Sequence, residues 1–127
     1  MALDKKHDEV ICVDFDGVIS DYKDGWQGPY LFGPPIEGAF EFIDALLTRG
    51  YKVRVFTARA QWPNMDRAIR DWMIDNGLPA ALVSQLEVDN VKCPAKLYID
   101  DRAFAFNGTW PSMKFVDSFE PWHKGGN

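Results

Sequence analysis

Short apolar runs and longer amphipathic stretches alternate along this chain. Val10 to Val13 is a continuous run rich in β-branched residues, which predicts a strand buried on both faces of a parallel sheet. Residues 19–35 carry Gly, Pro, Asp and aromatic side chains without any period, which predicts a long loop or flap. Apolar residues then recur every three or four positions from Ile36 to Leu47 and stop at Gly50, which predicts an amphipathic helix.

The rest of the pattern continues the alternation. A second strand is predicted at residues 51–56, where Lys and Arg alternate with Val, and a second helix from Pro63 to Gly77. Three shorter segments are predicted as further strands: residues 83–88, 96–99 and 113–116. Residues 119–127 are predicted to form a frayed tail. This order favours an α/β fold, a Rossmann-like sheet that is mainly parallel, with helices on its faces in three layers.

The length and charge of the chain limit the functions that the protein can have. The chain has 127 residues, 46% of them apolar, which suits one domain over residues 1–127 with a core at about 9–118. A net charge of -5 and a pI near 4.9 argue against tight binding to nucleic acid. Cys12 and Cys93 form no CxxC pair, so neither zinc nor a disulfide framework is indicated. The charged N-terminus resembles neither a signal peptide nor a membrane span, so we expect a cytoplasmic protein.

Polar side chains follow several of the predicted strands. Ligands of open α/β sheets bind beyond the carboxyl ends of the strands, so residues at those ends are the first candidates for a site. The candidates at these ends are Asp14, Asp16, Thr57, Lys92, Asp100 and Asp101.

Asp14-Phe15-Asp16-Gly17 places two carboxylates one residue apart where a strand opens into a loop, and Gly17 permits a sharp turn. Taken alone, this segment is equally consistent with an ordinary strand-end turn. Joined by a second acidic pair, however, these carboxylates would repel one another unless a cation lay among them. Oxygen ligands beside a phosphate favour Mg²⁺.

The other candidates are weaker when taken singly. Thr57 offers a hydroxyl and a backbone N–H to a phosphate oxygen, but a threonine after a strand is most often a turn or cap residue. Lys92 offers a point charge, but most loop lysines are simply solvated. Asp100 and Asp101 are costly at a buried strand end unless a metal ion or an arginine pairs with them, and Asp100 is the preferred metal ligand.

Together these residues resemble the haloacid dehalogenase superfamily of phosphohydrolases over about Val10 to Ala103. The four motifs of that family are matched, in order, by the following segments: Asp14-Phe15-Asp16-Gly17-Val18, Val55-Phe56-Thr57-Ala58-Arg59, Lys92 before Pro94, and Tyr98-Ile99-Asp100-Asp101.

The resemblance implies a role for each of these positions. Asp14 would be the nucleophile that forms an aspartyl-phosphate, and Asp16 the acid that protonates the leaving alcohol and later deprotonates water. Asp16 would need a raised pKa for the first step. The phosphoryl group would be held by residues of the second and third motifs: Thr57, Ala58, Arg59 and Lys92. Magnesium would be held by Asp14, the carbonyl of Asp16, Asp100 and, through water, Asp101.

This chain departs from the family pattern in two ways. Only seven residues separate Lys92 from Asp100, so Lys96 is an alternative for the phosphate-binding lysine. We prefer Lys92, because Lys96 would begin a strand at the opposite edge of the sheet. There is also no room for a cap domain, which predicts a capless, solvent-open site that accepts bulky substrates or is closed by a partner or a homo-oligomer.

Several roles stay open on the sequence alone. The flap aromatics Trp26, Tyr30 and Phe32 could stack on a base or sugar, or anchor the flap to the core. Arg59 and Arg102 could reach substrate or pair with the local acids. His7 and His123 are expected at the surface without a role.

Three other functions are alternatives to a phosphatase that acts on a small metabolite or nucleotide. A receiver-type phosphoacceptor domain has its acidic groups in a different order. A phosphatase acting on nucleic-acid ends suits the acidic pI poorly. A catalytically silent phosphate-binding module of the same fold is the main alternative.

Overall fold

The computed structural model describes residues 9–124. Its strands are β1 (Val10–Asp14), β2 (Lys52–Phe56), β3 (Glu87–Asp89) and β4 (Leu97–Ile99). Its helices are α1 (Ala39–Thr48), the short 3₁₀ helix η2 (Ala58–Gln61), α2 (Met65–Asp75), α3 (Ala80–Val83) and α4 (Met113–Ser118). The strands predicted near residues 10, 51 and 96 and both long helices are therefore present, with boundaries within a few residues of those expected.

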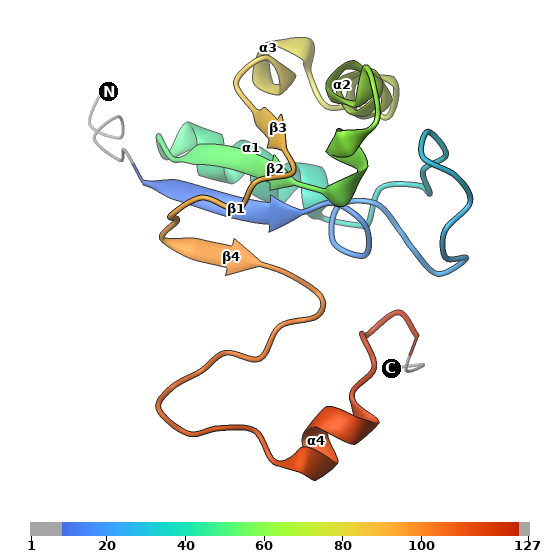
Figure 1. The fold of residues 1–127 in the computed structure, drawn as a ribbon. Helices are drawn as coiled ribbons and strands as arrows, with labels where there is room; N and C mark the ends of the chain where they lie inside the picture. The colour runs from blue at the N-terminus through green and yellow to red at the C-terminus, as the bar shows by residue number, and fades with distance from the viewer. Residues whose placement is uncertain (1–8, 125–127) are drawn as a thin grey trace.

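The four strands form one parallel sheet in the order β3-β2-β1-β4 (Figure 1). Val13 of β1 is level with Val55 of β2 and with Ile99 of β4, so the carboxyl ends of the three strands lie together. The prediction of an α/β Rossmann-like fold with a parallel sheet is confirmed.

One face of the sheet is covered by helices. Alternate strand residues such as Val13 and Val55, 2% and 0% exposed, join one core cluster with Ile43 of α1 and with Ile69 and Met73 of α2. Both helices end where their amphipathic pattern predicts, because Gly50 and Gly77 follow their C-termini with positive φ. The first helix begins at Ala39, three residues after the predicted start. This single cluster is the core.

The opposite face of the sheet is crossed by a loop, whereas the three-layer prediction placed helices there. The chain from β3 to β4 crosses it as an extended connection, residues 90–96, in front of β1 (Figure 1). In this connection the Nζ of Lys92 lies over the rings of Phe56 and Tyr98, and the carbonyl of Cys93 accepts a hydrogen bond from the Tyr98 hydroxyl. The expected third layer is therefore a loop in the described part of the chain, because only seven residues join these two strands.

The flap predicted at 19–35 is a long loop tied back to the first strand's end. The Ser20 hydroxyl accepts from the Gly33 N–H, and Ile36 donates its backbone N–H to the Ile19 carbonyl. Phe32 packs edge-on against Phe15 and Trp72. Phe32 therefore anchors the flap to the core, one of the two roles left open for the flap aromatics.

Two predicted strands need correction. Residues 83–88 contain the end of α3 and the start of β3. Residues 113–116 are not a strand but the first turns of α4, where the Ser112 hydroxyl accepts from the Phe115 N–H as an N-cap. A strand there would have no neighbour to pair with, because the chain has left the sheet, whereas a helix satisfies its backbone groups internally.

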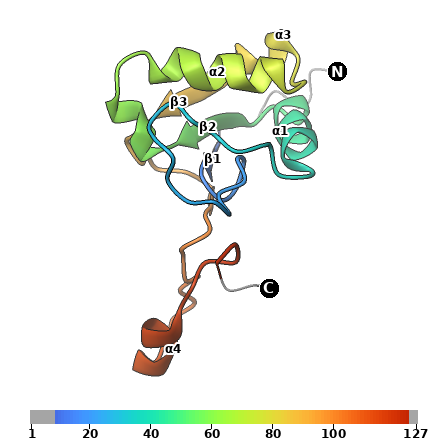
Figure 2. The ribbon, with the colours of Figure 1, turned by 90° about the vertical axis from the view of Figure 1, so that its right-hand side faces the viewer.

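Residues 102–120, which we call the arm, extend away from the sheet and its helices. Figures 1 and 2, seen at right angles, both place α4 well clear of them. None of the α4 residues is buried. Trp110 is 78% exposed on this arm. Among residues 9–124, no helix has the length and apolar character needed to cross a membrane.

Candidate functional site

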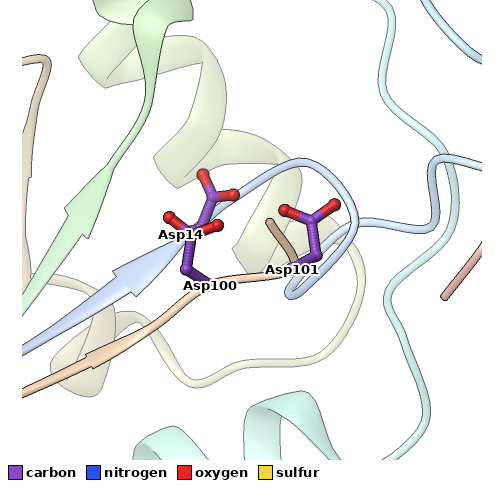
Figure 3. Close-up of side chains that lie close together, drawn as sticks. All are labelled: Asp14, Asp100 and Asp101. Carbon is purple, nitrogen blue, oxygen red and sulfur yellow. The ribbon is translucent and has the colours of Figure 1, made fainter. Parts of the chain in front are cut away.

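Three carboxylates meet at the carboxyl edge of the sheet. Asp14 is the last residue of β1, and Asp100 and Asp101 directly follow β4, the parallel neighbour of β1. One carboxylate oxygen from each residue lies within 4.8 Å of the others, and all three residues are partly buried. Figure 3 shows Asp14 and Asp100 side by side, with Asp101 across the turn that follows β1.

This cluster raises the cost of ionising Asp14. Burial, a hydrogen bond to Asp101 and the charges of Asp100 and Asp101 raise the pKa of Asp14 from 3.8 to about 8. The backbone N–H of Phe15, which donates to Oδ1 of Asp14, opposes this shift but does not cancel it. The arrangement has hard oxygen donors and uncompensated negative charge, so it fits a cation such as Mg²⁺.

Asp101 is held by a residue from the end of the chain. Nε2 of His123 lies 2.8 Å from Oδ2 of Asp101, and the two side chains are 0% and 3% exposed. A carboxylate only accepts hydrogen bonds, so Nε2 of His123 is the donor. The buried Nδ1 of His123 has no hydrogen-bond partner among the described residues.

Gly17 makes room for this pair. Its φ is +84°, and a Cβ at this position would lie 2.4 Å from Oδ2 of Asp101 and 3.0 Å from the His123 ring. A side chain is therefore excluded both by backbone conformation and by space. The glycine of the first motif thus serves the contact between Asp101 and His123 as well as the turn.

The expected frayed tail instead packs onto the site as far as residue 124. The Trp122 indole N–H donates to the Gly17 carbonyl at 2.8 Å, and the His123 ring lies edge-on to Tyr22. The expectation of a surface position for His123 is therefore wrong, while His7 lies outside the described residues. We call residues 121–124 the clasp, because they join the turn after β1 to Asp101.

Asp16 does not join the carboxylate cluster. Both of its oxygens accept from Arg59, at 2.8 Å from Nε and 3.0 Å from Nη2. Arg59 is 2% exposed, donates through Nη1 to the carbonyls of Gly28 and Pro29, and lies against the rings of Trp26 and Phe32. Of the two roles left open for Arg59, the structure shows pairing with a local acid. Because both oxygens of Asp16 are engaged by Arg59, neither faces a leaving group in this arrangement.

Arg102 is also placed by a local acid. Its backbone N–H donates to Oδ1 of Asp100 at 2.8 Å, as in an Asx turn. Arg102 is the first residue of the arm, and it lines a hollow there together with Phe104 and Phe115.

Thr57 lies at the end of β2 and is 2% exposed. Its hydroxyl oxygen accepts from the Arg59 N–H and so caps η2, which Ala58 begins. Its backbone N–H donates to the Asp89 carbonyl. Contrary to the prediction, the Thr57 N–H is therefore not free to bind a phosphate oxygen. The hydroxyl hydrogen remains the donor that Thr57 can offer.

Lys92 and Lys96 lie at different ends of the sheet. The Lys92 Nζ is 5.6 Å from the centre of the Phe56 ring, at the level of Asp14 in the neighbouring strand. The Lys96 Nζ lies 3.8 Å from Glu9, and its backbone N–H donates to the Val10 carbonyl at the start of β1. The Lys92 Nζ is also 5.1 Å from the centre of the Tyr98 ring, which is level with Cys12 of β1. Lys92 is therefore nearer than Lys96 to the end of the sheet where the carboxylates lie.

Two hollows adjoin these groups. One of about 290 Å³ is lined by Gly17, Asp100, Asp101 and Trp122, among others. The other, of about 360 Å³, lies within the flap and has Arg59 in its wall. The first hollow gives access to Asp100 and Asp101, although Asp14 does not line it. The second hollow borders Arg59, the residue that holds Asp16.

The clasp is the part of the site that sequence reasoning missed. His123 and Asp101 are 22 residues apart, and Trp122 and Gly17 are 105 residues apart. A single sequence carries no periodicity or motif that reports contacts of this kind.

Comparison with known proteins supports the fold alone. No protein-family model matches the chain, and no curated protein matches it. A solved structure of a conserved protein coded by a locus of Bacteroides thetaiotaomicron is similar, with a TM-score of 0.56 and 25% sequence identity over 87% of each chain. Its description states no activity, so function must be argued from the geometry of the site.

Proposed function

We propose that this protein is a magnesium-dependent phosphatase that hydrolyses a phosphate monoester through an aspartyl-phosphate on Asp14. The observation that carries the proposal is the cluster of Asp14, Asp100 and Asp101 at the carboxyl edge of a parallel sheet. A capless member of the haloacid dehalogenase superfamily would have these groups in this order.

Asp14 is the nucleophile in this proposal. Its carboxylate attacks phosphorus, the bond to the leaving alcohol breaks, and water later cleaves the acyl phosphate to regenerate Asp14. Asp14, Asp100 and the Asp16 carbonyl would hold Mg²⁺, with Asp101 as a further ligand or through water. The bound cation supplies positive charge that favours ionised Asp14 and neutralises phosphoryl oxygens.

Asp16 supplies the proton for the leaving alcohol only after its pair with Arg59 opens. Both carboxylate oxygens accept from Arg59 in the present arrangement. Arg59 also holds two flap carbonyls, so a movement of the flap would accompany release of Asp16. We therefore propose that the structure represents a resting state in which the acid is unavailable.

Lys92 and Thr57 bind the phosphoryl oxygens. Lys92 is exposed, and its ammonium group lies over the rings of Phe56 and Tyr98, of which Phe56 is level with Asp14. Thr57 offers its hydroxyl hydrogen from a buried, fixed position. An ammonium and a hydroxyl suit a dianionic phosphate monoester.

The substrate class is a small phosphorylated metabolite, such as a nucleotide or sugar phosphate. The hollow beside Asp100 and Asp101 has a volume of about 290 Å³, which suits a small molecule. The negative net charge of the chain disfavours long nucleic-acid substrates.

A silent phosphate-binding module is the second candidate. The specific observation that favours it is the bidentate pair between Asp16 and Arg59, since a permanently paired Asp16 would leave the site without an acid. Such a module would bind phosphate in the presence of Mg²⁺ without turnover.

The test is hydrolysis of an aryl phosphate with and without Mg²⁺ by wild type and Asp14→Asn. The matched control is Asp75→Asn, which makes the same change at an exposed position at the end of α2. We expect Mg²⁺-dependent turnover by wild type and by Asp75→Asn, and none by Asp14→Asn.

A screen of nucleotide and sugar phosphates follows with the same three proteins. Binding of inorganic phosphate without hydrolysis of any ester by folded wild type would support the silent module instead. Turnover that survives in Asp14→Asn would exclude an aspartyl-phosphate at this position.

A further inference from the structure

The arm concentrates the exposed apolar surface of the molecule. Among residues 9–124, ten of the sixteen large apolar residues that are exposed lie between positions 97 and 122. Seven of them belong to the arm: Phe104, Phe106, Trp110, Met113, Phe115, Val116 and Phe119, from 39% to 78% exposed. A surface of this kind, gathered on one segment, marks an interaction site.

The arm has little to hold its shape by itself. Its ring contacts join arm residues to one another: Phe104 with Phe115 at 5.5 Å, Phe106 with Trp110 at 4.7 Å, and Phe115 with Phe119 at 5.9 Å. The six-residue α4 is far shorter than a helix that is stable alone in water. The extended arm therefore requires a surface that covers it.

The same chain offers a second apolar surface beside the arm. β4 is an edge strand, paired with β1 on one side only. Leu97 and Tyr98 of this strand are 50% and 41% exposed. Unpaired edges with exposed apolar side chains favour association with another chain.

Charge argues for a protein partner and against an anionic one. The charged residues of the arm are two basic and two acidic: Arg102, Lys114, Asp117 and Glu120. The arm is therefore neutral, although the whole chain carries a net charge of -5. Anionic lipid or nucleic acid would find no basic patch on the arm to bind. Two arms can meet without net repulsion.

We propose that the arm is the interface of a homodimer, in which the arm of each copy packs against the arm and β4 edge of the other. Each copy presents both surfaces, as a two-fold contact requires. The 19 residues of the arm together with β4 match the roughly 20–30 residues that a standard interface uses on each side. This proposal is independent of the reaction proposed above.

The dimer would also stabilise the site. The arm begins directly after Asp101 and ends directly before the clasp, whose His123 binds Asp101. Fixing the arm against a second copy fixes both ends of this loop. Formation of the dimer thus favours the contact that orients Asp101.

The test compares Phe115→Asp with Phe42→Asp by sedimentation and light scattering over a range of concentrations. Both phenylalanines are exposed to nearly the same extent, 42% and 44%, but Phe42 lies on α1. We expect wild type and Phe42→Asp at twice the chain mass of 14.5 kDa. Phe115→Asp should dissociate at least about tenfold more readily.

Hydrogen exchange of residues 104–119 in the same samples shows whether the arm itself is covered in the dimer. The dimer predicts protection that is lost on dilution and in Phe115→Asp, with circular dichroism showing an intact fold. A wild-type monomer, with the arm protected or not, would overturn the proposal, as would open-ended association or a dimer unaffected by Phe115→Asp.

Discussion

Asp14 shows how burial and neighbouring charge act on a single side chain. It ends a buried strand opposite two further acids, so burial and like charge act on it together. In the absence of metal, a proton on Asp14 lowers the negative charge of the cluster. The proposed metal ion and this proton would therefore compete for the same carboxylates.

The first prediction concerns stability and pH without metal. The pKa of Asp14 is about 8 in the folded protein and near 3.8 when unfolded, so the folded state binds the proton more tightly. Stability of the metal-free protein should therefore decrease as pH rises from about 4 to about 8, and level off above. Melting temperatures determined by calorimetry between pH 4 and pH 8 measure this loss of stability. Added Mg²⁺ should restore the lost stability at pH 8.

Asp14→Asn isolates the contribution of this group. An amide carries no charge to repel, so we expect the metal-free variant to melt higher than wild type at pH 8 and to lose much of the pH dependence. Asp75→Asn should behave as wild type. A metal-free Asp14→Asn protein that is less stable than wild type at pH 8 would show that the cluster is not electrostatically strained.

The second prediction concerns His123 as a positioning residue for Asp101. His123→Leu removes the N–H that donates to Asp101, whereas His123→Gln keeps a donor of similar reach. Partners of this kind typically change metal affinity by roughly 10- to 100-fold. We expect His123→Leu to lose metal affinity by this factor and His123→Gln to recover much of it. The affinity for Mn²⁺ is measured by titration calorimetry on proteins whose folding is matched by circular dichroism. Equal affinities of Leu and wild type would assign His123 a packing role only.

At the scale of elements, the flap depends on one buried cation. Arg59 joins Asp16 of the first motif to two flap carbonyls and lies against two flap rings. Five donors in a planar fork allow these simultaneous contacts, which a lysine cannot reproduce. The flap position and the availability of Asp16 are therefore coupled.

The third prediction tests this coupling with Arg59→Lys. We expect faster hydrogen exchange in residues 22–34 while the core strands remain protected, because the bidentate pair and the carbonyl contacts are lost. Arg67→Lys, at an exposed position of α2, is the control. Unchanged exchange in the flap would mean that its aromatic packing alone holds it.

Pattern reasoning succeeded at the elements whose apolar faces join the core. The strands near Val13, Val55 and Ile99 and the helices α1 and α2 have periodicities imposed by burial on one face of the sheet. It failed at 113–116, where apolar residues face solvent and their periodicity therefore reports no burial. A short apolar run of this kind is compatible with a strand or a helix. Whether it forms a strand depends on whether the chain lies next to another strand at that point.

At the scale of the whole molecule, the sequence predicted which strand ends would meet but not how the site is completed. Asp14 and Asp100 meet because parallel neighbours bring their carboxyl ends together, which follows from topology. The Asp16–Arg59 pair and the clasp depend on how loops fold across those ends. Loop geometry is not encoded in any local period, so these contacts needed the structure.

The fourth prediction tests the central claim, that Asp14 carries the phosphoryl group. Wild type mixed with an aryl phosphate and Mg²⁺, then quenched in acid within the first turnover, is measured by intact mass and by peptide mapping of the adduct. We predict the added mass of one phosphoryl group on Asp14, absent without Mg²⁺ and absent from Asp14→Asn. Turnover without any phosphorylated Asp14, or an adduct at another residue, would contradict the account.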